Sequence, residues 1–255
     1  MEPYRIDETE ISRHGPGNLL AVCWKQWRAE RALAARGIHF RTTDPTVAEA
    51  AYAAMTAGEF EAVNGRQAWA NWRTIPRALS GNIPEQPLLV VDLGCGTGPS
   101  TSVLAFYCPA GSRVIGYELA EPLVRIAGRR SYPDRAGRPA QVTFVAQPVT
   151  KPLCDASGVL LGDGSVDVVN ASGIVGHHFT EATIGPLVDE IRRVLSQRGI
   201  AMLDVGPTLG EAVLTRLMDR AGFVATGRYR SWPFDPTGEI VFRRSGASAN
   251  TPKVG

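Results

Sequence analysis

The chain has 255 residues, of which 44% are hydrophobic and 20% are charged, and its formal net charge is +2. This length suits one compact domain with an added segment and allows a large core. The small net charge argues against a nucleic-acid partner that depends on a strong basic field. No apolar run is long enough to span a membrane, and the polar start MEPYRIDETE has no secretory-signal pattern, so we expect no membrane partner.

The cysteines and the last residues give two further expectations. Cys23, Cys95, Cys108 and Cys154 show no metal-ligand spacing. We therefore expect no metal, and a reducing cytoplasm rather than a disulfide framework. Residues 245–255, SGASANTPKVG, are small and polar and are expected to form a flexible tail.

Residues 1–85 show helical patterns and no alternation typical of strands. Asn18 is a candidate helix cap, and Asp44 followed by Pro45 offers a cap and a first-turn proline. Helices are expected over residues 18–35, 44–55 and 59–79. Four tryptophans of this region either pack on the rest of the protein or line an aromatic pocket: Trp24, Trp27, Trp69 and Trp72.

The most informative stretch is 88–98, which reads LLVVDLGCGTG. Its apolar run predicts a strand that is buried on both faces. The three alternate glycines that follow let the backbone turn tightly and approach a ligand closely. Pro99 then opens a predicted helix, whose free N–H groups favour an anionic group. The pattern predicts a nucleotide-binding loop between a strand and a helix.

The spacing D-x-G-x-G-x-G over residues 92–98 differs from the dinucleotide fingerprint G-x-G-x-x-G and from the phosphate-binding P-loop. It resembles the first motif of class I S-adenosylmethionine-dependent methyltransferases. In that family the loop wraps the amino acid end of the cofactor, and S-adenosylhomocysteine is the product. The resemblance implies that the cofactor is bound by Asp92, Gly94, Cys95, Gly96 and Gly98.

A second apolar strand is predicted over residues 113–117, with Glu118 at its end. An acidic residue at this place accepts hydrogen bonds from the two hydroxyls of a ribose in Rossmann-type sheets. We therefore assign Glu118 and the adjacent Leu119 to the cofactor site. A helix is expected to follow over residues 121–130.

A third strand is predicted over residues 141–146. In the family that the chain resembles, an Asp usually follows and binds the exocyclic amine of adenine. Here Gln147 stands at about that position. A Gln side chain carries an acceptor and donors, so Gln147 is the candidate adenine contact, with Asp155 as a substitute on the loop that follows.

The stretch 164–179, GSVDVVNASGIVGHHF, resembles the fourth strand of the family and the loop after it. Ligands of open α/β sheets bind outside the carboxyl ends of the strands, so residues 170–179 are expected to border the active site and Asn170 to contact the cofactor. A helix is expected over residues 186–197, with Gly199 after it as its stop. The remaining elements are expected as a helix over 209–221 and strands over 200–205, 223–229 and 239–243.

Strands and helices alternate from residue 86 to 244, which predicts a doubly wound sheet with right-handed crossovers. The resemblance implies an α/β, Rossmann-like sheet of seven strands whose last strand is antiparallel. Residues 1–85 would form a helical cap that, by analogy, covers the cofactor and shapes the acceptor pocket.

The resemblance implies transfer of a methyl group to an acceptor by in-line displacement, for which orientation and removal from water supply most of the acceleration. His177 and His178 are candidate general bases, or they shield the cofactor. Residues 170–173 read NASG and lack the Asn/Asp-Pro-Pro-aromatic motif of enzymes that methylate planar amines or nucleobases.

We therefore expect a small organic acceptor with an O, C or N centre. The alternatives are a protein or RNA substrate, or a protein that binds S-adenosylmethionine without transferring methyl groups. A Rossmann oxidoreductase is disfavoured because G-x-G-x-x-G is missing from the sequence. The sequence leaves the oligomeric state open.

Overall fold

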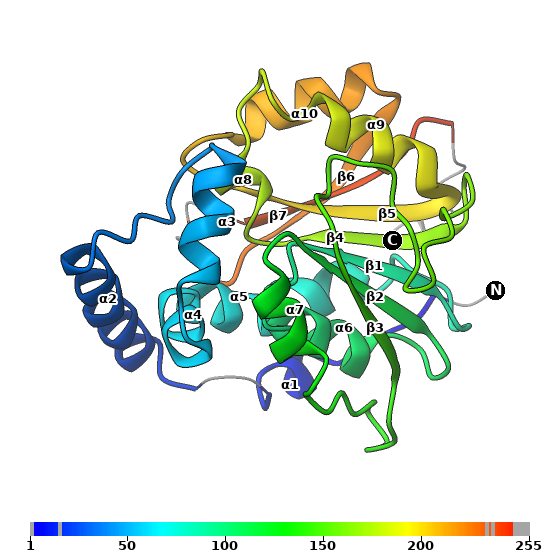
Figure 1. Ribbon diagram of the computed structural model, residues 1–255. Helices are drawn as coiled ribbons and strands as arrows, with labels where there is room; N and C mark the ends of the chain where they lie inside the picture. The colour runs from blue at the N-terminus through cyan, green and yellow to red at the C-terminus, as the bar shows by residue number, and fades with distance from the viewer. Residues whose placement is uncertain (1–2, 15–16, 233–234, 236–237, 247–255) are drawn as a thin grey trace.

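The computed structural model describes residues 3–14, 17–232, 235 and 238–246. Its centre is a sheet in the order β3-β2-β1-β4-β5-β7-β6, with helices on both faces (Figure 1). Strands β1 to β5 pair in parallel, and β7 runs antiparallel to both β5 and β6. The strands are β1 Leu89–Leu93, β2 Arg113–Glu118, β3 Gln141–Ala146, β4 Val166–Ala171, β5 Leu195–Val205, β6 Phe223–Tyr229 and β7 Gly238–Arg244. The predicted seven-stranded sheet with an antiparallel last strand is confirmed.

The helices of the described residues fall into an N-terminal group and a group that alternates with the strands. The first group is α1 Glu8–Ile11, α2 Leu19–Ala35, α3 Pro45–Ala53, α4 Ala57–Val63 and α5 Gly65–Leu79. The second is α6 Pro99–Tyr107, α7 Glu121–Ala127, α8 Val175–His178, α9 Gly185–Val194 and α10 Glu211–Arg220.

Each face of the sheet has its own apolar core. On one face, strand residues such as Val91 and Leu203 pack with Leu187 of α9 and Leu214 of α10. On the other face, α1, α5 and α6 pack beneath the strands, and Leu79 is fully buried there. A smaller core joins α2, α3 and α4 to α7. This smaller core fixes the N-terminal helices above the carboxyl ends of the strands, where ligands of such sheets bind.

The predicted caps of two N-terminal helices are confirmed. Asn18 Oδ1 accepts a hydrogen bond from the Ala21 amide at 3.1 Å. Asp44 Oδ1 accepts from the amides of Thr46 and Val47, at 2.9 and 3.2 Å. These bonds satisfy donors that a helix N-terminus leaves without intrahelical partners.

The single helix expected over 59–79 is wrong, because the chain forms α4 and α5 with a break at Asn64. The Asn64 side chain turns back and donates to the Phe60 carbonyl at 2.9 Å. At Gly65 a Cβ would lie only 3.1 Å from Val22 Cγ1, so α2 packs directly against the break. Here a tertiary contact overrides a continuous helical pattern.

Two expectations in the second half of the chain also need correction. The helix that begins at Gly185 ends at Val194 rather than at 197, and β5 starts at the next residue. Gly199 is therefore a strand residue, and a Cβ there would lie 2.9 Å from the Asp167 carbonyl oxygen. The region 170–179, expected as a loop, contains the short helix α8.

The tryptophans of the N-terminal region separate into three environments. Trp24 and Trp27 stack on each other with ring centroids 5.0 Å apart and are 59% and 46% exposed. They lie at the surface and line neither of the two cavities described below. Trp72 packs edge-on against Phe106 of α6, with centroids 5.8 Å apart. Trp69 is buried and lines a cavity described below.

The four cysteines are all free thiols. Among the described residues, no helix is both long and apolar enough to cross a membrane. Within the same residues no cluster of His, Cys, Asp or Glu side chains could hold a metal ion. Most of the expected tail, residues 247–255, lies outside the described residues.

Candidate functional site

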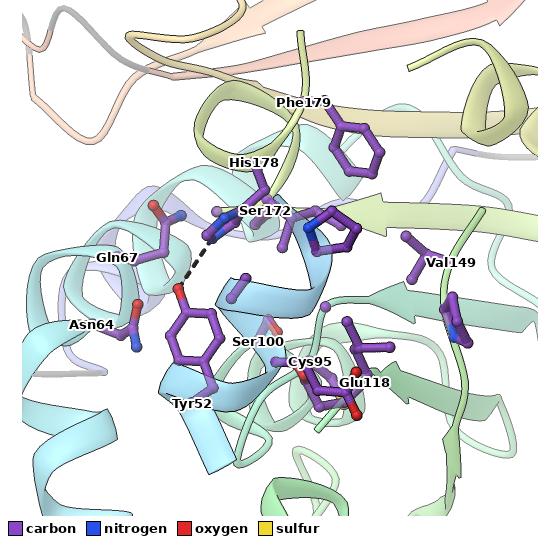
Figure 2. A pocket seen from close by; sticks show the side chains of 18 of the residues that line it. Tyr52, Asn64, Gln67, Cys95, Ser100, Glu118, Val149, Ser172, His178 and Phe179 are labelled. Atoms are coloured by element: carbon purple, nitrogen blue, oxygen red, sulfur yellow. Dashed lines mark hydrogen bonds between the residues drawn. The ribbon is translucent and has the colours of Figure 1, made fainter. Parts of the chain in front are cut away.

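A cavity of about 490 Å³ lies at the carboxyl ends of β1, β2 and β4 (Figure 2). The strand side contributes the β1 loop with Cys95, the end of β2 with Glu118 and the β4 turn with Ser172. Helices α3, α4 and α5 close it from the other side, through residues such as Tyr52 and Gln67. The volume falls in the range of small-molecule and cofactor pockets.

The loop after β1 depends on three glycines with left-handed backbone. The φ angles of Gly94, Gly96 and Gly98 are +70°, +55° and +91°. A Cβ at Gly94 would clash with Ile174, one at Gly96 with the Phe60 ring, and one at Gly98 with the Tyr132 hydroxyl. The loop is therefore shaped by protein on these sides, and substitution is both strained and obstructed.

Asp92 supports this loop from beneath. Its Oδ2 accepts hydrogen bonds from the hydroxyls of Ser100 and Thr101 at 2.7 and 2.6 Å. Its Oδ1 accepts from Nδ2 of Asn170, at 2.7 Å, from the adjacent strand β4. Burial raises the pKa of Asp92, and these hydrogen bonds oppose that shift. Asp92 and Asn170 are both buried beneath the loop and do not line the cavity.

Glu118 stands at the end of β2 and lines the cavity. Its Oε2 accepts from the Gly96 amide at 3.1 Å, and its Oε1 accepts from the Ala120 amide at 2.9 Å. Burial raises the pKa of this carboxyl group, and the backbone hydrogen bonds from Ala120 and Gly96 oppose the rise. The Leu119 amide is a third backbone donor to this carboxylate, and because a carboxylate offers about four acceptor positions, it can still accept from a ligand's hydroxyl group. Leu119 lines the cavity beside it.

The side chain of Gln147 is committed to its own loop. Its Nε2 donates to the Pro152 carbonyl at 3.2 Å, and its Oε1 accepts from the Cys154 amide at 3.3 Å. The cavity is lined instead by the next three residues, 148–150. Asp155 likewise accepts hydrogen bonds from Ser157 and Val159 in a local turn, which lower its pKa. Neither candidate adenine contact lines the cavity.

The structure separates the two adjacent histidines. His178 Nδ1 lies 2.8 Å from the Thr42 carbonyl oxygen, and its Nε2 lies 3.0 Å from the Tyr52 hydroxyl (Figure 2). Because a carbonyl only accepts, Nδ1 carries the proton and Nε2 accepts the hydrogen bond of Tyr52. Burial lowers the pKa of His178, with a smaller contribution from His177, so the ring is held neutral.

His177 does not line this first cavity. Its Nε2 lies 4.0 Å from an oxygen of Asp204, and its side chain is 39% exposed. Asp204, at the end of β5, accepts from the amides of Ile174, Val175 and Gly176 at 2.8 to 3.1 Å. It thereby fixes the start of α8, and with it the position of both histidines.

A second cavity of about 680 Å³ adjoins the first. The two share a wall whose side chains include Tyr52, Gln67 and His178. The second cavity adds His177, Trp69, Trp232 and Asp235. Sequence reasoning missed Tyr52, Gln67 and Asp204 as site residues, since only the tertiary fold brings them to the carboxyl edge of the sheet.

The comparisons with known proteins agree with this geometry. The sequence profile of a family described as a methyltransferase domain matches residues 90–199. No curated protein matches the sequence.

Two solved structures are similar in fold. One is the complex between the Haloferax volcanii Trm112 methyltransferase activator and a methyltransferase, with 18% identity over 77% of this chain and 97% of that one, and a TM-score of 0.56. The other is magnesium protoporphyrin IX methyltransferase from Synechocystis with bound S-adenosylhomocysteine, with 18% identity over 75% and 88% and a TM-score of 0.53. These two structures show the fold, which is that of Rossmann-like methyltransferases. The methyltransferase-domain profile covers residues 90–199, which include the glycine loop and Glu118.

Proposed function

We propose that the first cavity binds S-adenosylmethionine and that the protein transfers its methyl group to a small organic acceptor. The observation that carries this proposal is the Glu118 carboxylate, which lines the cavity and is held by the Gly96 amide of the glycine loop. This hydrogen bond joins the glycine loop and the strand-end Glu118 in one site. The carboxylate can still accept a hydrogen bond from a ribose hydroxyl.

The other cavity residues fit the remaining parts of the cofactor. Leu119 and Val149 give apolar walls suited to the adenine ring, and Gly94 and Cys95 border the part of the cavity next to the loop. Asp92, Asn170, Gly96 and Gly98 support the loop rather than touch the cofactor in this proposal. Gln147 acts indirectly in this proposal: its hydrogen bonds to Pro152 and Cys154 hold the loop that places residues 148–150 at the cavity.

Methyl transfer mainly requires the protein to align the acceptor with the methyl group of the cofactor. When bound, S-adenosylmethionine supplies a methyl group on a positively charged sulfur, which an aligned nucleophile can attack. The chain's own contribution is to orient the acceptor and to keep water out. Helices α3, α4 and α5 close the cavity from above, so region 1–85 serves as the cap and the acceptor side of the site.

A small acceptor is favoured over a macromolecule by the position of the two cavities beside the N-terminal helices, which line both of them, and by the net charge of +2. The free cysteines agree with a reducing, cytoplasmic location, which we retain as part of the proposal. Two alternatives to this proposal are tested with it. In the first, the methyl acceptor is a protein or an RNA. In the second, the protein binds S-adenosylmethionine but transfers no methyl group.

The test uses S-adenosylmethionine labelled in its methyl group, incubated with the purified protein and separate pools of small molecules, proteins and RNA. Label in a small-molecule product, with an equal amount of S-adenosylhomocysteine, supports the proposal. Label only in protein or RNA would contradict the acceptor class. Binding of the cofactor without any label transfer across the pools would favour the binding protein.

A further inference from the structure

The shared wall of the two cavities contains a hydrogen-bonded pair built from distant parts of the chain. Tyr52 comes from α3 and His178 from α8, 126 residues apart, and their contact spans 3.0 Å. Both side chains line both cavities. An acceptor in the second cavity would therefore meet a methyl donor in the first cavity beside this pair.

The hydrogen bonds of the pair run in one direction: Tyr52 donates to His178, and His178 donates to Thr42. Thr42 O accepts the Nδ1 proton of His178, so Nε2 presents a lone pair to the Tyr52 hydroxyl. The Tyr52 oxygen keeps its own lone pairs for a further donor. The chain Thr42–His178–Tyr52 thus ends in an acceptor of protons at the junction of the cavities.

Burial is the main cause of the pKa shifts of both members of the pair, and neighbouring groups modify them. Burial and the Glu118 carboxylate of β2 raise the pKa of Tyr52, and Arg41 opposes them. Burial and His177 lower the pKa of His178, and the hydrogen bond to the Thr42 carbonyl and the Asp204 carboxylate of β5 oppose them. The resting pair is therefore a phenol hydrogen-bonded to a neutral imidazole, and the only proton acceptor that this imidazole presents to Tyr52 is its Nε2 lone pair.

The second cavity has aromatic walls and a buried donor. Trp69 is 8% exposed, and within the described residues its Nε1 has no hydrogen-bond partner. Trp232, which is 39% exposed, lines the same cavity. The Arg73 guanidinium covers one face of the Trp69 ring at 3.7 Å from its centroid, and the indole atoms that line the cavity give it apolar, aromatic walls suited to a planar ligand.

We propose that Tyr52 is a catalytic residue that takes the proton of the acceptor in relay with His178, and that the acceptor is a planar aromatic hydroxyl compound of the phenol class in the second cavity. This inference rests on the proposed function. It also revises the role of His178, whose Nε2 lone pair is occupied by Tyr52 and reaches the acceptor only through it.

The step balances as a proton relay coupled to displacement. The acceptor hydroxyl gives its proton to the Tyr52 oxygen as the Tyr52 proton passes to Nε2 of His178. The acceptor oxygen uses its electron pair to form the new O–CH₃ bond, and the electrons of the methyl–sulfur bond stay on the sulfur. The His178 imidazolium then releases its proton to solvent through the second cavity, which it also lines.

The acceptor site is tested at pH 5.5, where 4-nitrophenol keeps its hydroxyl proton, by binding two probes to protein saturated with S-adenosylhomocysteine: 4-nitrophenol and nitrobenzene, which lacks the hydroxyl. We expect 4-nitrophenol to bind about tenfold more tightly, because its hydroxyl donates to Tyr52. Tyr52→Phe keeps the ring and should abolish this preference. The matched control is Tyr107→Phe, since Tyr107 is buried in α6, lines neither cavity and has a hydroxyl without a partner among the described residues. Equal binding of the probes, no saturable 4-nitrophenol binding, or a preference that survives Tyr52→Phe would overturn the proposal.

The relay is tested by nuclear magnetic resonance of protein with ¹⁵N-labelled imidazoles, with the His178 signals assigned from a His178→Gln variant. We expect a neutral His178 with the proton on Nδ1, and a higher pKa in Tyr52→Phe because the neutral form loses a hydrogen bond. A proton on Nε2, or an unchanged pKa in the variant, would contradict the relay. These spectra need no cofactor. Failure of S-adenosylhomocysteine to bind would therefore remove the proposed function, whereas normal binding with the wrong tautomer would remove only this inference.

Discussion

The Glu118 carboxylate holds the glycine loop from the neighbouring strand, because its Oε2 accepts the Gly96 amide hydrogen at 3.1 Å. The two residues are 22 positions apart in the chain and come from the ends of β2 and β1. One side chain thus stabilises the loop and also lines the cavity. Loop conformation and ligand binding are therefore expected to respond together to changes at Glu118.

Glu118→Ala should weaken the binding of S-adenosylhomocysteine by about 1–3 kcal/mol, because the ribose hydroxyls and the Gly96 amide both lose their acceptor. Isothermal titration calorimetry measures the effect. The control is Glu121→Ala, an exposed carboxylate three residues further on. A dissociation constant unchanged in Glu118→Ala would remove the ribose assignment.

Asp92→Ala should lower the free energy of unfolding by about 2–4 kcal/mol, since the buried partners Ser100, Thr101 and Asn170 each lose a hydrogen-bond acceptor. Urea unfolding gives the value, and Asp189→Ala on the exposed side of α9 is the control. Wild-type stability combined with lost ligand binding would instead make Asp92 a direct contact of the cofactor.

Gly96→Ala should destabilise the protein because the new Cβ meets the Phe60 ring and because φ is +55° there. A double-mutant cycle separates the two causes. In a Phe60→Ala background the same change should cost less, by about 0.5–3 kcal/mol, while the backbone strain remains. An identical cost in both backgrounds would show that Phe60 does not restrict this position.

Glu239 of β7 predicts a pH dependence of stability. Burial, with Asp204 and Asp92 nearby, raises its pKa to about 8, and Thr74 opposes the rise. Between the ordinary value of 4.5 and 8 the folded state binds more protons at this site than the unfolded state. The contribution of this group to stability is therefore present at low pH and is lost as pH rises toward 8.

Glu239→Gln imitates the protonated acid and should remove this dependence. Its stability relative to wild type should grow with pH between 4.5 and 8, by up to about 1.4 kcal/mol for each pH unit. Urea unfolding at pH 5, 6.5 and 8 measures both proteins. Parallel stability curves would show that Glu239 is ionised in the folded state.

The sequence was sufficient to predict the parts of the site that are local in the chain. The buried strand, the glycine loop and the strand-end Glu118 follow one another within about thirty residues, and their spacing is visible in the residue types. The alternation of elements predicted the doubly wound sheet, and the resemblance to a known family supplied its seven strands and antiparallel last strand, whereas the strand order came only from the structure. These features depend on backbone geometry and burial, which local patterns report well.

Contacts between distant segments were beyond such reasoning. Nothing near Tyr52 in the sequence indicates His178, and Asp204 reads as an ordinary strand residue although it fixes the start of α8. Asp92 is a family motif residue, but only the structure shows that its acceptor positions are used by Ser100, Thr101 and Asn170. Hydrogen bonds between such distant side chains depend on which elements the fold brings together.

The central claim is that the first cavity is an S-adenosylmethionine site. The most direct test is calorimetric titration of the purified protein with S-adenosylhomocysteine, with NAD as the control ligand. The structure predicts saturable binding of S-adenosylhomocysteine, with a dissociation constant on the order of micromolar, and no binding of NAD. No binding of S-adenosylhomocysteine, or tighter binding of NAD, would contradict the claim.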